Sequence, residues 1–113
     1  MSRRDDVICE VEATLRVIGG RWKPMIVYAL FDRPHRFGEL RRRIPGVTPK
    51  MLTQQLRDLE ADRIVYREVF AAVPPRVEYS VTALGETLRP IMEAMYRWAA
   101  VYRQVLDEGS TAE

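Results

Sequence analysis

Cysteine and histidine are scarce in this chain of 113 residues, which has one of each, Cys9 and His35. A single cysteine cannot form a disulfide within the chain, and this is typical of proteins from a reducing compartment. One histidine without a second ligand at metal-binding spacing predicts no metal site, and His35 is expected in a surface loop beside Pro34. We therefore expect no catalytic residues, no metal and no cofactor, and the protein is not predicted to be an enzyme.

Long hydrophobic runs and glycine-rich phosphate loops are also absent. No apolar run is long enough to cross a bilayer, and residues 1–6 are polar, unlike a signal peptide. Gly19 and Gly20 are adjacent, but we interpret them as the end of a helix. The sequence predicts a cytoplasmic protein that does not contact a membrane.

The chain does contain the pattern of a helix-turn-helix. Residues 37–44 predict a short helix in which Leu40 and Ile44 share the buried face. The rest of its surface is basic and includes Arg41. A Pro-Gly pair then stops this helix and provides the turn.

Residues 48–63 predict the second helix, with Thr48 at its N-cap and leucines at positions 52, 56 and 59 on its buried face. The opposite face is polar, and its side chains are suited to phosphates and to base edges in a major groove. The alternative is an ordinary helix face exposed to solvent. The residues of this face are Lys50, Thr53, Gln54 and Arg57.

Two segments rich in β-branched and aromatic residues, joined by a linker with two prolines, occupy residues 64–81. They predict a two-stranded wing whose tip the prolines keep extended. Arg67 and Arg76 are then available to a phosphate backbone or a minor groove. The alternative is a plain hairpin stabilised by an ion pair between Arg67 and Glu78.

Positive charge is concentrated in residues 33–76, which carry a net charge of +5, whereas residues 1–32 are neutral and residues 77–113 carry −3. A local positive excess of this kind is typical of a surface that binds nucleic acid. The predicted DNA-binding residues are Arg36, Arg41, Thr48, Lys50, Thr53, Gln54, Arg57, Arg67 and Arg76.

Two flanking helices are predicted to form a dimer interface. Residues 82–107 predict a C-terminal helix with an apolar stripe at heptad-like spacing, capped by Thr82 and kinked at Pro90. A helix at residues 9–18 is expected to pack against the C-terminal helix of the partner. The alternative is a C-terminal helix that packs only on its own subunit. The expected interface residues are Val11, Leu15, Ile18, Met95, Trp98, Tyr102 and Val105.

Five separate motifs resemble the HxlR-type family of bacterial transcriptional regulators. They lie in order at residues 9–13, 17–23, 36–41, 50–60 and 74–79. A visible departure is Arg63, where the family often has a glycine. The resemblance implies an α+β, mostly helical fold, a winged helix-turn-helix with extra N- and C-terminal dimerisation helices. It implies a single domain over residues 1–113, with the helix-turn-helix at about 37–63, the wing at 64–81 and the C-terminal dimerisation helix at 82–107.

Cys9 has two interpretations. At a helix N-terminus a thiolate is favoured, and the resemblance implies a sensor of oxidants, quinones or aldehydes, acting through an intersubunit or mixed disulfide or through alkylation. Acidic neighbours at positions 5, 6, 10 and 12 oppose the thiolate, and the alternative is a small apolar residue in the dimer interface. A cavity at that interface near Trp98 and Tyr102 is a further candidate site for an inducer.

Two functional hypotheses follow. The first is a homodimeric, sequence-specific DNA-binding transcriptional regulator that recognises a pseudo-palindromic double-stranded operator and responds to an electrophile or small molecule. The second is a winged-helix protein-interaction module that does not bind DNA. The arginine excess of residues 33–76 favours the first hypothesis.

Overall fold

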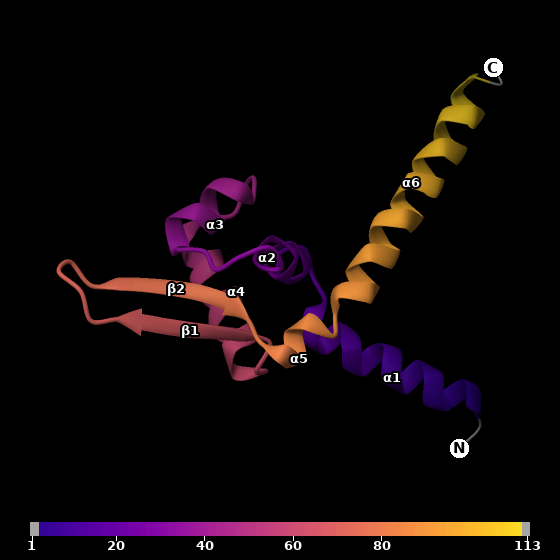
Figure 1. Cartoon of the computed structure of the whole chain (residues 1–113). Helices are drawn as coiled ribbons and strands as arrows, with labels where there is room; N and C mark the ends of the chain where they lie inside the picture. The colour runs from indigo at the N-terminus through magenta and orange to yellow at the C-terminus, as the bar shows by residue number, and fades with distance from the viewer. Residues whose placement is uncertain (1–2, 112–113) are drawn as a thin grey trace.

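The computed structural model describes residues 3–111, and side chains within it are described for residues 5–109. Over these residues the chain forms six helices and one two-stranded sheet (Figure 1). The elements are α1 (Arg3–Ile18), α2 (Lys23–Leu30), α3 (Phe37–Arg43), α4 (Pro49–Ala61), β1 (Val65–Phe70), β2 (Arg76–Val81), α5 (Ala83–Glu86) and α6 (Arg89–Thr111). The predicted fold, mostly helical with a small antiparallel wing, is confirmed.

Helix α4 begins where its sequence predicts. The backbone N–H of Met51 donates to Thr48 Oγ1 at 3.1 Å, and Pro49 takes the first helical position, where no N–H is needed. The apolar side chains that follow at helical spacing reach the core. The three predicted leucines are all buried: Leu52, Leu56 and Leu59.

The turn after α4 requires a left-handed residue. Arg63 has a φ of 63°, in the region that favours glycine. The N–H of Arg63 donates to the carbonyl of Glu60 at 3.0 Å, and that of Ile64 donates to the carbonyl of Leu59 at 2.9 Å. This pair of bonds is a Schellman motif, which explains why a glycine suits position 63.

Helix α2 is the centre of the core, in contact with α3, α4, α6 and β2. Its buried side chains are Ile26, Val27, Ala29 and Leu30. Leu40 and Ile44 from the end of α3 join them, as predicted. His35, in contrast, is fully buried, so its predicted place in a surface loop is wrong. The backbone of His35 pairs with Tyr79 of β2, which brings the segment before α3 into the core.

The wing pairs β1 and β2 in antiparallel register, from Val65 opposite Val81 to Phe70 opposite Arg76, and its tip extends away from the helices (Figure 1). In this register Arg67 lies opposite Tyr79. Glu78 lies opposite Glu68 and forms its ion pair with Arg76, so the alternative pair between Arg67 and Glu78 is not formed.

The predicted single helix over residues 82–107 is divided into α5 and α6. Thr82 caps the short α5 by accepting from the N–H of Gly85 at 2.9 Å. Pro90 stands at the second position of α6, so it begins a new helix where a kink within one was expected. At the other end of the chain, α1 is already helical at Arg3, well before the predicted start at residue 9.

Helices α1 and α6 diverge from the rest of the subunit (Figure 1). The radius of gyration is 17.3 Å, whereas a compact chain of this length has a radius of about 13 Å. The subunit is therefore open, and long faces of both helices are without contacts inside it. Among the described residues, no helix is both long and apolar enough to cross a membrane.

Candidate DNA-binding interface

The polar face of α4 is exposed as predicted. Lys50, Gln54 and Arg57 are exposed, and Thr53 beside them is half-buried. Gln54 is restrained within the helix, because its Nε2 donates to Asp58 Oδ1 at 3.0 Å. A carboxylate only accepts, so this bond turns the amide oxygen of Gln54 away from Asp58. That oxygen is then available to a donor such as the exocyclic amine of adenine or cytosine.

Helix α3 presents Arg41 and Arg42 to solvent, and Arg36 is exposed at its N-cap. The start of α3 depends on Glu39. Its Oε1 accepts from the backbone N–H of Arg36 at 3.1 Å, and its Oε2 pairs with Arg33 at 2.9 Å. These contacts lower the pKa of Glu39, first through the backbone N–H and then through the guanidinium.

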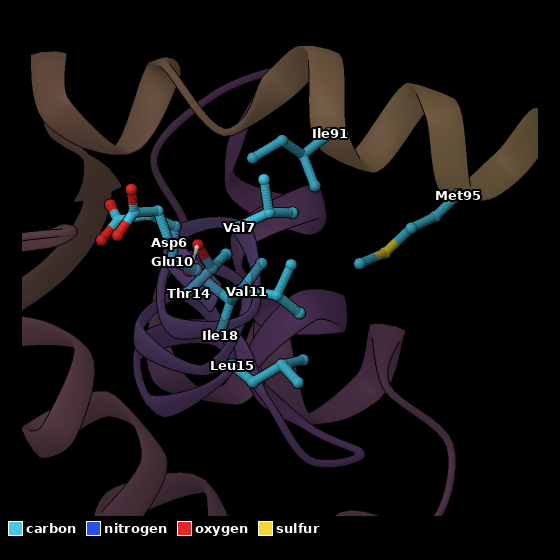
Figure 2. Close-up of a pocket in the computed structure, with 9 residues that line it drawn as sticks. All are labelled: Asp6, Val7, Glu10, Val11, Thr14, Leu15, Ile18, Ile91 and Met95. Carbon is cyan, nitrogen blue, oxygen red and sulfur yellow. Dashed lines mark hydrogen bonds between the residues drawn. The ribbon is translucent and has the colours of Figure 1, made fainter. Parts of the chain in front are cut away.

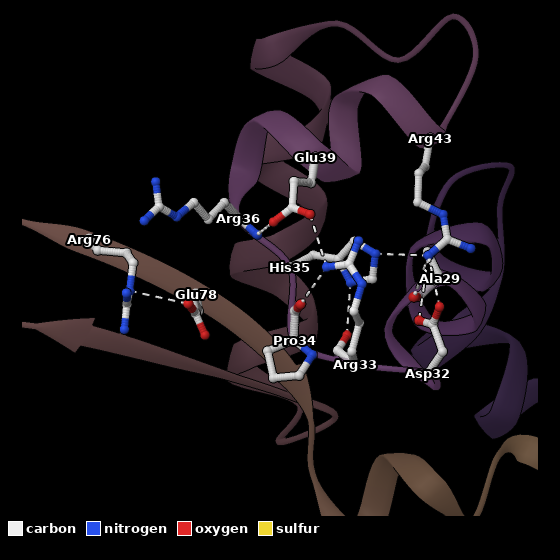
Figure 3. Close-up of polar contacts among 10 residues, drawn as sticks. All are labelled: Ala29, Asp32, Arg33, Pro34, His35, Arg36, Glu39, Arg43, Arg76 and Glu78. Carbon is white, nitrogen blue, oxygen red and sulfur yellow. Dashed lines mark hydrogen bonds and ion pairs between the residues drawn. The ribbon is translucent and has the colours of Figure 1, made fainter.

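Arg43 is exposed like Arg41 and Arg42, with 43% of its side chain accessible, but one of its guanidinium nitrogens also contacts α2 and the loop before α3. Its Nη1 donates to the carbonyl of Ala29 at 3.2 Å and lies 3.3 Å from Asp32 Oδ2 and 2.8 Å from His35 Nε2 (Figure 3). Partial desolvation is the largest single influence on the pKa of Asp32 and would raise it, but the opposing influences, led by the charge of Arg43, together outweigh it and the net shift is downward. Arg43 therefore joins α3 to α2 through Nη1.

On the wing, Arg76 is held against its neighbours. Its guanidinium carbon lies 4.2 Å from the centre of the Phe70 ring, directly across the sheet. Arg76 Nε is 3.2 Å from Glu78 Oε2 and forms an ion pair, but the geometry is too poor for a hydrogen bond (Figure 3). Arg67 on β1 is exposed. Sequence reasoning missed Phe70, although the cross-strand register identifies it once the turn length is known.

The cationic side chains thus come from α3, α4 and the two strands of the wing. Helix α3 contacts β2, and α4 contacts β1. Thr48, at the start of α4, is also exposed. The predicted DNA-binding residues are therefore gathered on the helix-turn-helix and the wing, and their contacts with DNA remain a prediction.

The predicted dimer residues fall into two groups. All but one are exposed on α1 and α6, where the rings of Trp98 and Tyr102 stack with centroids 5.2 Å apart. Ile18 is only 2% exposed and lies in the core of its own subunit, so its assignment to the interface is wrong. The exposed members are Val11, Leu15, Met95, Trp98, Tyr102 and Val105.

An apolar groove of about 420 Å³ lies between α1 and α6. In Figure 2, Ile91 and Met95 of α6 point toward Val7 and Val11 of α1, and acidic side chains stand at one edge. Neither Trp98 nor Tyr102 lines it, so this hollow is not the cavity that was expected beside those rings.

Cys9 is exposed on α1. Because α1 is helical from Arg3, Cys9 lies in the second turn of the helix. The stabilisation of an anion by a helix N-terminus falls off within the first turn. The helix-terminus argument for a Cys9 thiolate is therefore wrong, although the thiol is accessible.

Known proteins resemble this chain over most of its length. The HTH-type transcriptional regulator YybR of Bacillus subtilis (strain 168) is 54% identical over 99 residues, which are 88% of this chain and 79% of YybR. The redox regulator HypR in its reduced form is 52% identical with a TM-score of 0.82, over 88% of this chain and 98% of HypR. In its oxidized form HypR is 54% identical with a TM-score of 0.79, over 82% of this chain and 96% of HypR.

These relatives are named as regulators, and none of the three names describes an enzyme. They support the DNA-binding hypothesis over the protein-interaction module. The HxlR-like helix-turn-helix family matches residues 17–107, which include all of the helix-turn-helix and the wing. The chain therefore belongs to the HxlR-like helix-turn-helix family and is a DNA-binding transcriptional regulator.

Proposed function

We propose that the protein acts as a homodimer on a pseudo-palindromic operator in double-stranded DNA, within the bacterial cytoplasm where that DNA lies. The observation that carries the proposal is the separation of two exposed surfaces on one open subunit. The polar face of α4 is suited to a major groove, and the apolar faces of α1 and α6 are suited to a second copy of the chain. A two-fold axis between subunits would place two α4 helices about 34 Å apart.

Within each half-site, Gln54 and Arg57 are proposed to contact base edges, because they occupy the exposed face of the helix that enters the groove. The remaining candidates are proposed to contact phosphates, which position the protein without reading sequence. These are Arg36, Arg41, Thr48, Lys50 and Thr53, with Arg67 and Arg76 on the wing.

The test is fluorescence anisotropy with a duplex selected by the protein from a random pool and with an unselected duplex, each at several salt concentrations. Gln54→Ala or Arg57→Ala should weaken binding to the selected duplex by about 1–3 kcal/mol and have little effect on the unselected one. Arg76→Ala should weaken both duplexes and reduce the salt slope by about one.

Arg103→Ala is a matched control, because this arginine is exposed on α6, outside the helix-turn-helix and wing. It should change neither affinity nor salt slope. Equal losses on both duplexes for Gln54→Ala and Arg57→Ala would make them phosphate contacts. Affinity that does not depend on salt would contradict DNA binding through this surface.

We further infer that oxidants act on the protein at Cys9. The thiol is exposed, and the chain is similar to HypR, a redox regulator with an oxidized and a reduced form. With one cysteine per chain, two Cys9 thiols from two subunits would lose two hydrogens to the oxidant and form one S–S bond, or each would form a mixed disulfide with a small thiol.

A further inference from the structure

The only histidine of the chain is also its only fully buried polar side chain among the described residues. His35 Nδ1 lies 2.8 Å from the carbonyl oxygen of Arg33, and Nε2 lies 2.8 Å from Arg43 Nη1 (Figure 3). Its backbone N–H and C=O each bond to Tyr79 at 2.8 Å. One residue therefore joins the loop before α3, the end of α3 and the second strand of the wing.

The two partners of the ring determine its protonation. A carbonyl oxygen can only accept, and a guanidinium can only donate. The proton of His35 must therefore be on Nδ1, and Nε2 must be the acceptor for Arg43. Arg43 Nη1 has two hydrogens to share among its acceptors. Of these acceptors, His35 Nε2 lies nearer to Nη1 than the carbonyl oxygen of Ala29 or Asp32 Oδ2 does. The observed arrangement requires a neutral imidazole.

We propose that neutral His35 is the positioning residue that holds the wing and α3 in one geometry for DNA, and that a proton on Nε2 disrupts this geometry and weakens binding. The proposal rests on the proposed use of α3, α4 and the wing as the DNA-binding surface. A proton on Nε2 would place two donors and two positive charges against each other, one of them on the fully buried ring of His35. Either the guanidinium of Arg43 moves away from His35, and the end of α3 loses this contact, or His35 shifts and displaces the backbone of Tyr79. Tyr79 is three residues from Arg76 on β2.

The other charged groups around His35 are already paired. From α3 come Arg43 and Glu39, and from the loop before it come Asp32 and Arg33. The carbonyl of Ala29 in α2 accepts from Arg43, and β2 contributes the backbone of Tyr79. Because the pKa of Asp32 and of Glu39 is lowered, both carboxylates stay charged throughout the range in which histidine titrates, about pH 5 to 8. Neither carboxylate therefore takes up a proton in that range.

The first test is DNA affinity of the full chain as a function of pH at constant ionic strength, on the selected duplex. Between about pH 8 and about pH 5.5 the wild type should lose affinity roughly tenfold or more, with a slope of log affinity against pH that approaches about two for the proposed dimer, one proton for each subunit. His35→Gln should bind within a few fold of the wild type near pH 8 and show a flat profile, because an amide oxygen accepts from Arg43 but does not titrate.

Two further variants make the test independent of how well His35→Gln folds. Arg43→Gln should also flatten the profile, because its amide can accept from a protonated imidazole as well as donate to a neutral one. Arg42→Gln is the matched control: the exposed neighbour loses the same charge, so overall affinity should fall while the pH profile is retained. Circular dichroism at each pH checks that every variant remains folded.

The second test needs no DNA. In ¹H–¹⁵N spectra the single histidine should show the Nδ1–H tautomer near pH 8. An Nε2–H tautomer, or a wild-type affinity that is equal near pH 8 and pH 5.5, would overturn the role of His35 while leaving DNA binding intact. A protein that binds no duplex near pH 8 would instead overturn the proposed DNA-binding surface, and this role of His35 with it.

Discussion

At the residue scale, the carboxylate of Glu39 holds the start of α3 through the backbone of Arg36 and the guanidinium of Arg33. Both contacts favour the charged form and lower its pKa. A carboxyl whose pKa is lower in the folded than in the unfolded state stabilises the fold above its unfolded pKa, about 4.3. That stabilisation is lost as pH falls through the folded value.

Glu39→Gln should therefore lower the melting temperature at neutral pH and have a smaller effect at about pH 3, because the wild-type carboxyl loses its charge as pH falls through its folded pKa. Thermal unfolding at the two pH values measures this. Glu60→Gln is a control, because Glu60 is exposed on α4 and its side chain has no ion pair among the described residues. A loss of equal size at both pH values would show that the charge of Glu39 is not what stabilises α3.

Cys9 makes a separate prediction at this scale. Diamide should convert the wild type into a disulfide-linked species and change its affinity for the selected duplex, whereas Cys9→Ser should fold, bind and ignore diamide. Non-reducing electrophoresis, mass spectrometry and anisotropy on the same samples measure modification and binding together. If Cys9 is modified and affinity is unaltered, or if this exposed thiol does not react, it has no role as a sensor.

At the element scale, the corner between the wing and α5 depends on one glycine. A Cβ on Gly85 would lie 2.4 Å from both the carbonyl oxygen of Ile64 and Cγ2 of Val81, closer than packed atoms allow. The carbonyl oxygen of Ile64 belongs to the backbone, so it cannot rotate away from the added methyl group. The close approach joins the end of the sheet to the start of α5, and so determines where the C-terminal helices leave the core.

Gly85→Ala should lower the free energy of unfolding by about 1–3 kcal/mol, since the new methyl group overpacks the corner. Gly109→Ala is the matched control, because no atom lies within 4 Å of its added Cβ in α6, and alanine should stabilise that helix by up to about 1 kcal/mol. Urea unfolding at equal protein concentration compares the two. A neutral Gly85→Ala would mean that the corner relaxes easily.

At the scale of the whole molecule, the open subunit exposes apolar side chains that a second copy would cover. Trp98 is 65% exposed despite stacking on Tyr102, and Val11 and Leu15 on α1 are 53% and 57% exposed. Large contiguous apolar surfaces of this kind mark interaction sites. The dimer proposed here would bury them.

Trp98→Ala combined with Tyr102→Ala should make that dimer dissociate at micromolar concentration, because two large aromatic contributions, together on the order of several kcal/mol, are lost. Sedimentation measures the assembly state. Tyr96→Ala is the control, since this exposed ring lies off the stripe on α6. A double variant that stayed dimeric but melted at lower temperature would show that the stripe packs within its own subunit.

The sequence by itself determined the helix-turn-helix and the wing. The Thr48 cap, the leucine stripe of α4 and the β-branched segments around the proline pair are local signals, because caps and periodic side chains act within a few residues of themselves. Arg63 was noted in the sequence only as a departure from a frequent glycine, and the structure shows that this position has a left-handed backbone.

Only the tertiary structure decided which side chains lie inside. His35 and Ile18 are buried because distant segments, β2 for the former and the packed core for the latter, close over them. Helix α1 begins at Arg3 and not at the predicted residue 9, so Cys9 is not at a helix terminus. The C-terminal segment forms two helices, α5 and α6, with a break before Pro90. Burial and element ends of this kind depend on contacts between residues far apart in the chain, which local patterns do not contain.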